Sequence, residues 1–580
     1  MYVRRCGPSK SKTRGAYWEL VESYRTERGP RQRVVAYIGD LEEAARVGVR
    51  QAARDQRGVF QPGLWGDNPE PEWVEVDATR VRVERVREFG GYWFGLAVWH
   101  RLGLSSFLAT VMDPGREEIP WSAMAALLVL MRLCEPSSEL RIAEHLYERS
   151  ALADILGIPP GKVNDDRLYR ALDNLVTHKG DLERHLTERL GALFDLEYDL
   201  LMYDITSTYF EGDSLRNAEA ARGYSRDHRP DCKQVCIALV VSRWGLPVGY
   251  EVFSGNRADV TTVEEIVEKV EAQYGKAQRI WVMDRGMVSA ENLAWLRASG
   301  RQYIVGTAKS QLRRFERELL EDDWQTVRDG LEVKLCHGED GEETFILCRS
   351  AARKQKEQAI HARFERRIAE GLDKLQASCA THRWKMGTVE RRVGRLLGAN
   401  SRASGLFQVE VRTRADGGAE VVWQKVETWR EWATLSEGCY LLRSNVRVWD
   451  AAQLWQAYTQ LTEAEAAFRI HKGDLRIRPI WHQTSERVHA HILVCFLSYV
   501  LWKAMGQMCK RAGLGDEPRK VFDEIAQLKV VDVILPTKKG IEIRKTCISS
   551  PTKPQAVLLA RLGLDLPTHL PRHDTEMRNV

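Results

Sequence analysis

The chain has 580 residues, of which 44% are hydrophobic and 29% charged, so it carries enough apolar sequence to bury several cores. Its formal net charge of +5 is mildly basic, a value that excludes neither nucleic-acid binding nor an ordinary enzyme. The longest apolar runs, 124–133 and 492–502, are shorter than the roughly 20 residues that span a bilayer. The basic N-terminus lacks the apolar segment of a signal peptide. We therefore expect a cytoplasmic protein of three or four domains without membrane association.

The eleven cysteines are scattered along the chain. Cys232 and Cys236 are the nearest pair, but no second pair follows at the distance that a structural zinc site requires. Reduced thiols in a cytosolic protein are the simpler interpretation.

Residues 1–75 are interpreted as a basic N-terminal module. Alternating runs at 17–24 and 33–38, joined through Gly29 and Pro30, predict a β-hairpin. Residues 1–35 carry nine Lys/Arg against three Glu, a net charge of +6. Such a charge suits either a DNA-contacting module or a solvated tail. A stretch rich in Pro, Gly and Asp at 61–71 predicts a linker.

Residues 76–197 predict a helical domain, which we expect to bind DNA. Apolar residues recur every three or four positions in 81–102, 121–132, 138–147 and 166–193. This spacing is typical of helices with one buried face.

From residue 199 the pattern becomes α/β. Apolar runs at 200–204, 234–242, 248–253, 279–284 and 303–306 predict strands, and 261–274 and 290–298 predict helices. The order β-β-β-α-β-α-β is that of a layered α/β domain. A charged insertion at 308–437 interrupts it, and its segment 349–395 has thirteen Lys/Arg against five Asp/Glu, a net charge of +8. A strand at 439–443 and helices at 450–471 and 487–512 follow, and 506–580 is a mixed C-terminal region.

Two aspartates end predicted strands of this region, Asp204 and Asp284. Sites in open α/β sheets form at the carboxyl ends of strands. If the two strands are neighbours, the carboxylates share one crevice and repel each other unless a proton or a cation intervenes. Hard oxygen ligands select Mg²⁺ or Mn²⁺. The plainer alternative is that each Asp caps a turn or a helix, which is our interpretation of Asp199, Asp213, Asp227 and Asp259.

A third carboxylate lies on an apolar face of the predicted helix 450–471. The face consists of residues at offsets of 4, 3, 4, 3 and 4: Leu454, Tyr458, Leu461, Glu465, Phe468 and Lys472. A buried, unpaired carboxylate is costly, and a metal ion shared with Asp204 and Asp284 would explain Glu465, whereas Glu463 points away to solvent. The alternative is an ion pair of Glu465 with Arg469 or Lys472. Three carboxylates placed in this way suit two-metal phosphoryl transfer.

The same helix carries most of a known signature, Tyr-x2-Arg-x3-Glu-x6-Lys. Tyr458, Glu465 and Lys472 match it, and Leu461 stands at the position of the Arg. The chain resembles the bacterial insertion-sequence DDE transposases that this signature marks. Further stretches resemble the same group, at 203–212, 223–231, 245–249, 255–259, 284–287 and 475–482.

The resemblance implies an RNase H-like catalytic core at 198–307 and 438–505, a β-rich insertion at 308–437, and cut-and-paste chemistry with Mg²⁺, for which Mn²⁺ should substitute. It implies that Lys472 contacts a phosphate near the scissile bond and that Tyr458 supports the transposon-end strand. Without it, a snorkelling lysine and a core tyrosine are the plainer interpretations. The expected partners are double-stranded DNA, as terminal inverted repeats and target, and a second copy in a DNA-bridged dimer at the nucleoid. Further DNA contacts are expected from Arg469, Arg476 and Arg478.

Two other functions remain open. One is a DNA-binding relative of the same fold that no longer cuts, against which the three intact carboxylates argue. The other is a stand-alone structure-specific nuclease, which would need neither the basic N-terminal module nor the basic insertion. A gel assay that separates nicking from strand joining would discriminate among the three.

Overall fold

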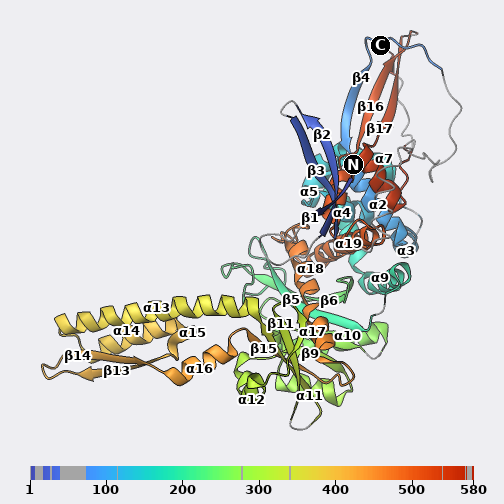
Figure 1. Cartoon of the computed structure of the whole chain (residues 1–580). Helices are drawn as coiled ribbons and strands as arrows, with labels where there is room; N and C mark the ends of the chain where they lie inside the picture. The colour runs from blue at the N-terminus through green and yellow to red at the C-terminus, as the bar shows by residue number, and fades with distance from the viewer. Residues whose placement is uncertain are drawn as a thin grey trace.

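The computed structural model describes residues 2–6, 17–26, 29–39, 73–567, 570 and 578–579, apart from positions 114, 116, 197, 276–278, 339–340 and 539. The predicted linker at 61–71 and several N-terminal basic residues lie outside these ranges. Figure 1 shows a central α/β body with a long arm on one side and a narrow β-sheet that projects from the helical end.

A nine-stranded mixed sheet forms the body, in the order β10-β11-β12-β15-β9-β8-β5-β6-β7. Strands β5, β8 and β9 run parallel, whereas β6 and β7 pair antiparallel beside β5. The predicted order β-β-β-α-β-α-β is confirmed. The bounds are β5 (Leu200–Tyr209), β6 (Gln234–Ser242), β7 (Pro247–Ser254), α10 (Val263–Tyr274), β8 (Ile280–Met283), α11 (Ala290–Ala298) and β9 (Gln302–Gly306).

The two faces of this sheet are buried by different helices. Side chains alternate along a strand, so Leu201 and Tyr203 of β5 pack with α10 and α11, while Leu200 and Met202 belong to the core on the other face. That second face is covered by α17 (Ala451–Thr459), α18 (Thr462–Lys472) and α19 (Ser485–Arg511).

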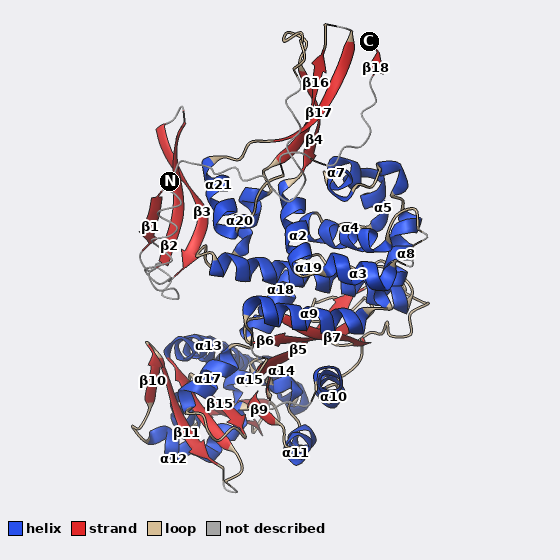
Figure 2. Ribbon diagram, turned by 90° about the vertical axis from the view of Figure 1, so that its right-hand side faces the viewer, coloured by secondary structure: helices blue, strands red, loops and turns tan. Residues whose placement is uncertain are grey.

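Helix α19 is long and apolar enough to cross a membrane, with a mean hydropathy of 1.5, and in the described part of the chain it is the one helix that is. The sequence expectation that its apolar run is too short is therefore wrong. However, 83% of its most apolar window is buried inside the fold, because helices of the helical region and the sheet enclose it (Figure 2).

The predicted single helix 450–471 is two helices, and the junction rotates the second. At the junction the backbone bonds span three residues, as from Leu461 N–H to the Tyr458 carbonyl (3.1 Å) and from Glu463 N–H to the Gln460 carbonyl (2.8 Å). Such a turn advances about 120° per residue and not about 100°. The face that begins with Leu454 therefore does not continue through Glu465.

The insertion divides between the body and the arm. Strands β10 (Gln325–Arg328), β11 (Leu331–His337) and β12 (Thr344–Ser350) extend the body sheet, and β15 (Cys439–Ser444) joins them to β9. The arm is mostly helical, so the expected β-rich insertion is wrong for this part. It consists of α13 (Ala351–Thr381), α14 (Met386–Ala399), α15 (Ser401–Ser404), β13 (Phe407–Thr413), β14 (Ala419–Lys425) and α16 (Glu427–Ser436).

The helical region packs around α19 (Figure 2). The predicted helix 81–102 is wrong at its start, where β4 (Arg82–Glu88) pairs with β16 (Lys529–Pro536), and the predicted helix 166–193 is two helices. The remaining elements include α2 (Gly90–Arg101), α3 (Leu104–Met112), α4 (Trp121–Cys134), α5 (Glu139–Arg141), α8 (Asp165–Val176) and α9 (Lys179–Phe194).

The N-terminal hairpin and part of the C-terminal region pack against the helical region. The predicted N-terminal hairpin is confirmed as β2 (Tyr17–Thr26) and β3 (Gly29–Gly39). Arg33 of β3 pairs at 2.8 Å with Glu524 of α20 (Pro518–Ile525). Arg4 of β1 (Tyr2–Cys6) pairs with Glu19 at 2.7 Å, so part of the basic charge is used internally. The C-terminal region adds β17 (Ile541–Ile548) and α21 (Lys553–Leu562).

Candidate active site

The parallel pairing of β5 and β8 brings Asp204 and Asp284 to the same level of the sheet. The register runs from Leu200 opposite Ile280 to Tyr203 opposite Met283, so the two aspartates are the next residues along each strand. Both share the face of Leu200 and Ile280, which is the face that α18 covers. The expectation that β5 ends at Asp204 is wrong, because pairing with β6 extends it to Tyr209.

The surroundings of Asp204 disfavour its ionised form. Burial raises the pKa of Asp204 to about 7, although the Ile205 N–H donates a hydrogen bond to its Oδ1 at 2.8 Å. The negative charges of Asp284 and Glu465 raise this pKa further, and Arg226 lowers it. Asp284 and Glu465 thus both lie within electrostatic reach of Asp204.

Glu465 is exposed on α18, in contrast to the buried position that the sequence pattern predicts. The rotated helix buries Ala464, Ala467, Phe468 and His471 instead. Glu465 and Glu463 lie on opposite flanks of this buried face, about 200° apart round the helix. Glu463 is not free in solvent as expected, since it pairs with Lys503 at 2.9 Å.

Tyr458 stands beside the carboxylates. A Cβ added at Gly306, at the end of β9, would lie only 2.6 Å from the Tyr458 hydroxyl oxygen, so the glycine makes room for the ring. Burial raises the pKa of Tyr458, and the charge of Asp284 adds to this effect. The phenol therefore remains a neutral hydrogen-bond donor near Asp284.

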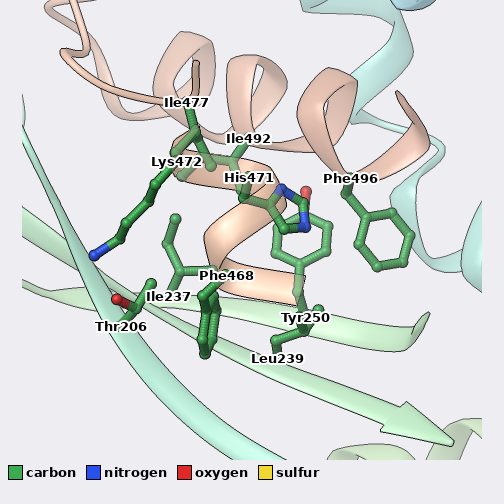
Figure 3. Close-up of a pocket in the computed structure, with 10 residues that line it drawn as sticks. All are labelled: Thr206, Ile237, Leu239, Tyr250, Phe468, His471, Lys472, Ile477, Ile492 and Phe496. Atoms are coloured by element: carbon green, nitrogen blue, oxygen red, sulfur yellow. The ribbon is translucent and has the colours of Figure 1, made fainter. Parts of the chain in front are cut away.

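Lys472 and Arg478 share one buried carboxylate, Asp227, whose side chain is 2% exposed. Lys472 Nζ lies 2.7 Å from Asp227 Oδ1, and Arg478 pairs with the same oxygen. Figure 3 shows the Lys472 side chain reaching away from the apolar residues around Phe468. The pair of cations exceeds the single carboxylate by one positive charge.

Two further expected DNA contacts and several residues that the sequence analysis does not name as functional also lie near the carboxylates or on the same helix. Arg469 and Arg476, the two other expected DNA contacts, are exposed, and no ion pair of either is found within the described residues. Asp227 lies in a turn and Asp259 begins a short 3-10 helix, as the sequence interpretation has them. In addition, Asp259 pairs with Arg226, whose charge acts on Asp204. Arg226 and Asp227 are neighbours within 223–231, a stretch that resembles the transposases. This resemblance is the feature of the sequence that could have identified them as functional residues.

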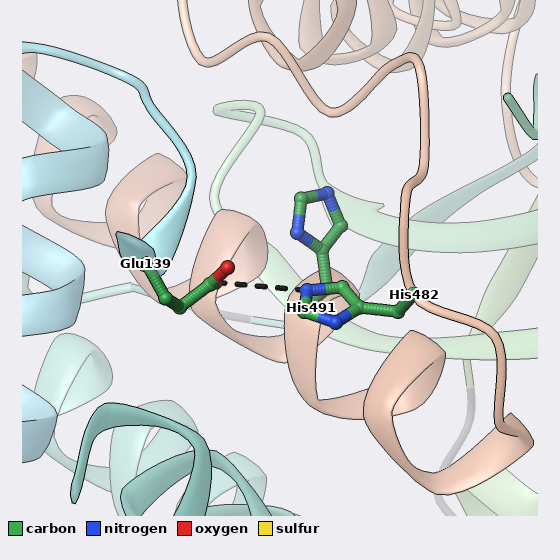
Figure 4. Close-up of side chains that lie close together, drawn as sticks. All are labelled: Glu139, His482 and His491. Carbon is green, nitrogen blue, oxygen red and sulfur yellow. Dashed lines mark ion pairs between the residues drawn. The ribbon is translucent and has the colours of Figure 1, made fainter. Parts of the chain in front are cut away.

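A second polar cluster lies behind the segment that follows α18 (Figure 4). Glu139, His482 and His491 bring one ligand atom each within 4.8 Å of one another, with Glu139 Oε1 3.6 Å from His482 Nε2. The buried Arg132 lies 3.5 Å from His491 Nδ1, and its charge balances Glu139. Burial lowers the pKa of His491 to about 3. Burial alone would raise the pKa of Glu139, but the hydrogen bond and charge of His482 outweigh burial and lower this pKa. The cluster thus forms a polar network that joins α4, α5 and α19.

Comparisons with known proteins found two family models and a distant structural likeness. The family model of the transposase DDE domain matches residues 196–501, and that of the IS1634 family transposase N-terminal domain matches residues 8–60. A piggyBac transposase in a synaptic complex with hairpin DNA is a similar solved structure, with a TM-score of 0.35 and 8% identity over 78% of this chain and 82% of that chain. No curated protein matches.

A mixed sheet with two aspartates at the same level of neighbouring parallel strands, together with a DDE domain that matches residues 196–501, defines an enzyme that acts on DNA. The chain belongs to the DDE-domain transposases of bacterial insertion sequences. Such a domain implies use of a divalent metal ion. The carboxylate donor set fits one, because a bound cation would offset the burial and the carboxylate repulsion that together raise the pKa of Asp204.

Proposed function

We propose that this transposase binds the ends of its insertion sequence and cuts and joins DNA at Asp204, Asp284 and Glu465. The observation that carries the proposal is the register of β5 and β8, by which both aspartates lie at one level on the sheet face that carries α17 and α18. We further infer that the core is RNase H-like. The strand order β7-β6-β5-β8-β9, with three antiparallel strands followed by two parallel ones, supports this inference.

The three carboxylates would hold two Mg²⁺ ions, with Mn²⁺ able to substitute. When bound, the ions supply activation of the attacking oxygen and stabilisation of the leaving oxygen in an in-line displacement. The chain's part is to fix the carboxylates from a rigid sheet and an adjacent helix. Tyr458 offers a neutral donor beside Asp284, and Lys472 and Arg478 offer excess positive charge for a phosphate.

We propose the division of labour that the sequence suggests. Residues 1–75 and 76–197 contact DNA, 198–307 and 438–505 catalyse, 308–437 add the extended sheet edge and the arm, and 506–580 complete the helical end. The protein would act at the nucleoid as a DNA-bridged dimer on terminal repeats and target. Light scattering with and without end DNA tests the dimer, and an unchanged protomer count in the complex would contradict it.

Cleavage by alanine variants tests the catalytic assignment. Asp204→Ala and Asp284→Ala should lose Mg²⁺-dependent cleavage by orders of magnitude while binding of end DNA persists, because the aspartates contribute to chemistry and not to affinity. A gel assay of nicking and strand joining measures both steps. Full cleavage by either variant would remove that residue from the site.

A further inference from the structure

A groove separate from the carboxylates runs along the other flank of α18. It has a volume of about 820 Å³ and lies between the turn joining β6 to β7, the junction of α17 and α18, and α19 with the segment after it. Thr462, Glu463 and Ile470 of α18 line it, whereas Glu465 lies on the opposite flank of the helix's buried face. The groove is therefore close to the catalytic helix without being part of the catalytic face.

Tryptophan rings with cations over them characterise this groove. Lys510 Nζ lies 4.6 Å from the centre of the Trp244 ring, Arg328 lies 5.3 Å from that of Trp455, and Arg519 lies 4.3 Å from that of Trp502. Such contacts hold long cationic side chains in place over aromatic faces. The cations are thereby set in defined positions along the groove wall before any ligand arrives.

The charge of the groove is positive. Five cationic residues line it, Arg243, Arg328, Lys503, Lys510 and Arg519, against three acidic ones, Glu463, Asp516 and Glu517. Lys503 and Arg519 have carboxylate partners, Glu463 and Asp474. Arg328 and Lys510 are exposed and have no ion pair with any residue that the structure describes. These two side chains are available to an anion.

Trp244 is held in a fixed place at the groove wall while 40% of its surface remains exposed. The next residue, Gly245, has a φ of +69°, and a Cβ there would lie 2.3 Å from Glu463 Oε2 and 2.5 Å from Lys503 Nζ. The Tyr499 hydroxyl donates a hydrogen bond to the Gly245 carbonyl at 2.8 Å. The turn that carries Trp244 is thus held against α18 and α19, and Arg243 as well as Lys510 lies against the indole, 5.7 Å and 4.6 Å from its centre.

We propose that this groove binds a single DNA strand, with phosphates at Arg328 and Lys510 and a base against Trp244. Rigid aromatic faces next to unpaired cations are the features by which proteins hold single-stranded nucleic acid. The inference rests on the proposed function, because cleavage at the carboxylates would free a strand end near α18. It adds a place for one strand beside the catalytic helix.

Binding of a labelled single-stranded oligonucleotide of arbitrary sequence to the full chain tests the groove. The double variant Arg328→Gln/Lys510→Gln should lose about tenfold or more in affinity, and its salt slope should fall by about 1.4 because two fewer counterions are released. Trp244→Ala should lose roughly 5- to 100-fold with an unchanged slope, because stacking is uncharged. Lys520→Gln, exposed on α20 outside the groove, is the matched control and should bind like the wild type.

Melting temperatures confirm that each variant is folded, and duplex binding and cleavage are measured in parallel. Wild-type single-strand affinity in both groove variants would overturn the groove assignment while leaving cleavage, and hence the proposed function, intact. An acidic peptide is titrated against the same variants. If the groove variants lose binding of the peptide but keep binding of the oligonucleotide, the groove assignment is overturned in favour of a protein partner. Absence of duplex cleavage by the wild type would instead contradict the proposed function.

Discussion

At the scale of single residues, the catalytic face is built from charges whose balance differs from place to place. Burial, together with the negative charges of Asp284 and Glu465, raises the pKa of Asp204 to about 7. Asp227, by contrast, is buried between two cations. Around Asp204 the negative charges outweigh the single cation Arg226, which also pairs with Asp259, whereas around Asp227 the positive charges are in excess. This difference supports the proposal that cations bind at the first carboxylate and a phosphate near the second.

The raised pKa of Asp204 predicts a pH dependence of stability. An unfolded Asp titrates near about 4, so between about pH 4 and pH 7 the folded chain binds more protons than the unfolded chain. Stability therefore falls as pH rises through this window. In the presence of a chelator, the melting temperature should fall from pH 4 to pH 7 more steeply for the wild type than for Asp204→Asn, and Mg²⁺ should reduce the difference. Parallel curves for the two proteins would contradict this.

The variant Asp227→Asn tests whether Lys472 and Arg478 contribute to cleavage through their defined positions or only through their positive charge. The variant keeps both cations and gains one net positive charge, so non-specific DNA affinity should stay equal or increase. Cleavage should fall about tenfold or more, because the cations lose the carboxylate that fixes them. Unfolding should become easier by about 1–3 kcal/mol. Asp231→Asn, an exposed neighbour that pairs with Arg229, is the control; equal cleavage by the two variants would count against positioning.

At the scale of elements, the tight turn between α17 and α18 decides which glutamate faces the aspartates. Without it, Glu465 would be buried in the apolar face that begins at Leu454. With it, Ala464, Ala467 and Phe468 take the buried positions, and Glu465 is exposed, within electrostatic reach of Asp204.

The matched variants Glu465→Gln and Glu463→Gln test this rotation. Glu465→Gln should melt at the wild-type temperature, since its side chain is exposed, but lose cleavage by orders of magnitude because a metal ligand is lost. Glu463→Gln should keep cleavage and lose at most about 1 kcal/mol with its partly exposed ion pair to Lys503. Cleavage rates and melting curves decide; an active Glu465→Gln enzyme would refute the three-carboxylate site.

At the scale of the whole molecule, the arm carries positive charge away from the body (Figure 1). Helix α13 exposes Arg353, Lys356, Arg363, Arg366 and Arg367, none of which has an ion pair among the described residues. The arm has its own small core around Ile368, Leu372 and Val389, so changes to its surface should leave the catalytic body folded.

The triple variant Arg363→Gln/Arg366→Gln/Arg367→Gln should therefore weaken duplex binding. Its salt slope should fall by up to about 2.7, because about 0.9 fewer counterions are released for each phosphate contact that is lost. Titrations at several salt concentrations measure both quantities. Arg412→Gln is the control on the same arm, because Arg412 pairs with Glu410. A salt slope equal to that of the wild type would mean that α13 is a solvated face.

The sequence by itself determined the α/β order of the core and the identity of the candidate carboxylates. Apolar residues repeat every two positions in strands and every 3.6 positions in helices, because of local backbone geometry. The order of strands and helices from β5 to β9 could therefore be predicted from the sequence alone. The N-terminal hairpin could be predicted for the same reason. The family signature singled out Glu465 even where its expected burial was wrong.

Only the tertiary structure decided what depends on contacts between distant segments. Asp204 lies mid-strand because β6 prolongs β5, β4 is a strand because β16 pairs with it, and the charged insertion splits between the sheet edge and a helical arm. Asp227 is buried only because Lys472 and Arg478, about 245 residues later, meet it. Pairing partners and charge neighbours of this kind leave no periodic trace in a single sequence, because the free energy that selects them arises between segments and not within them.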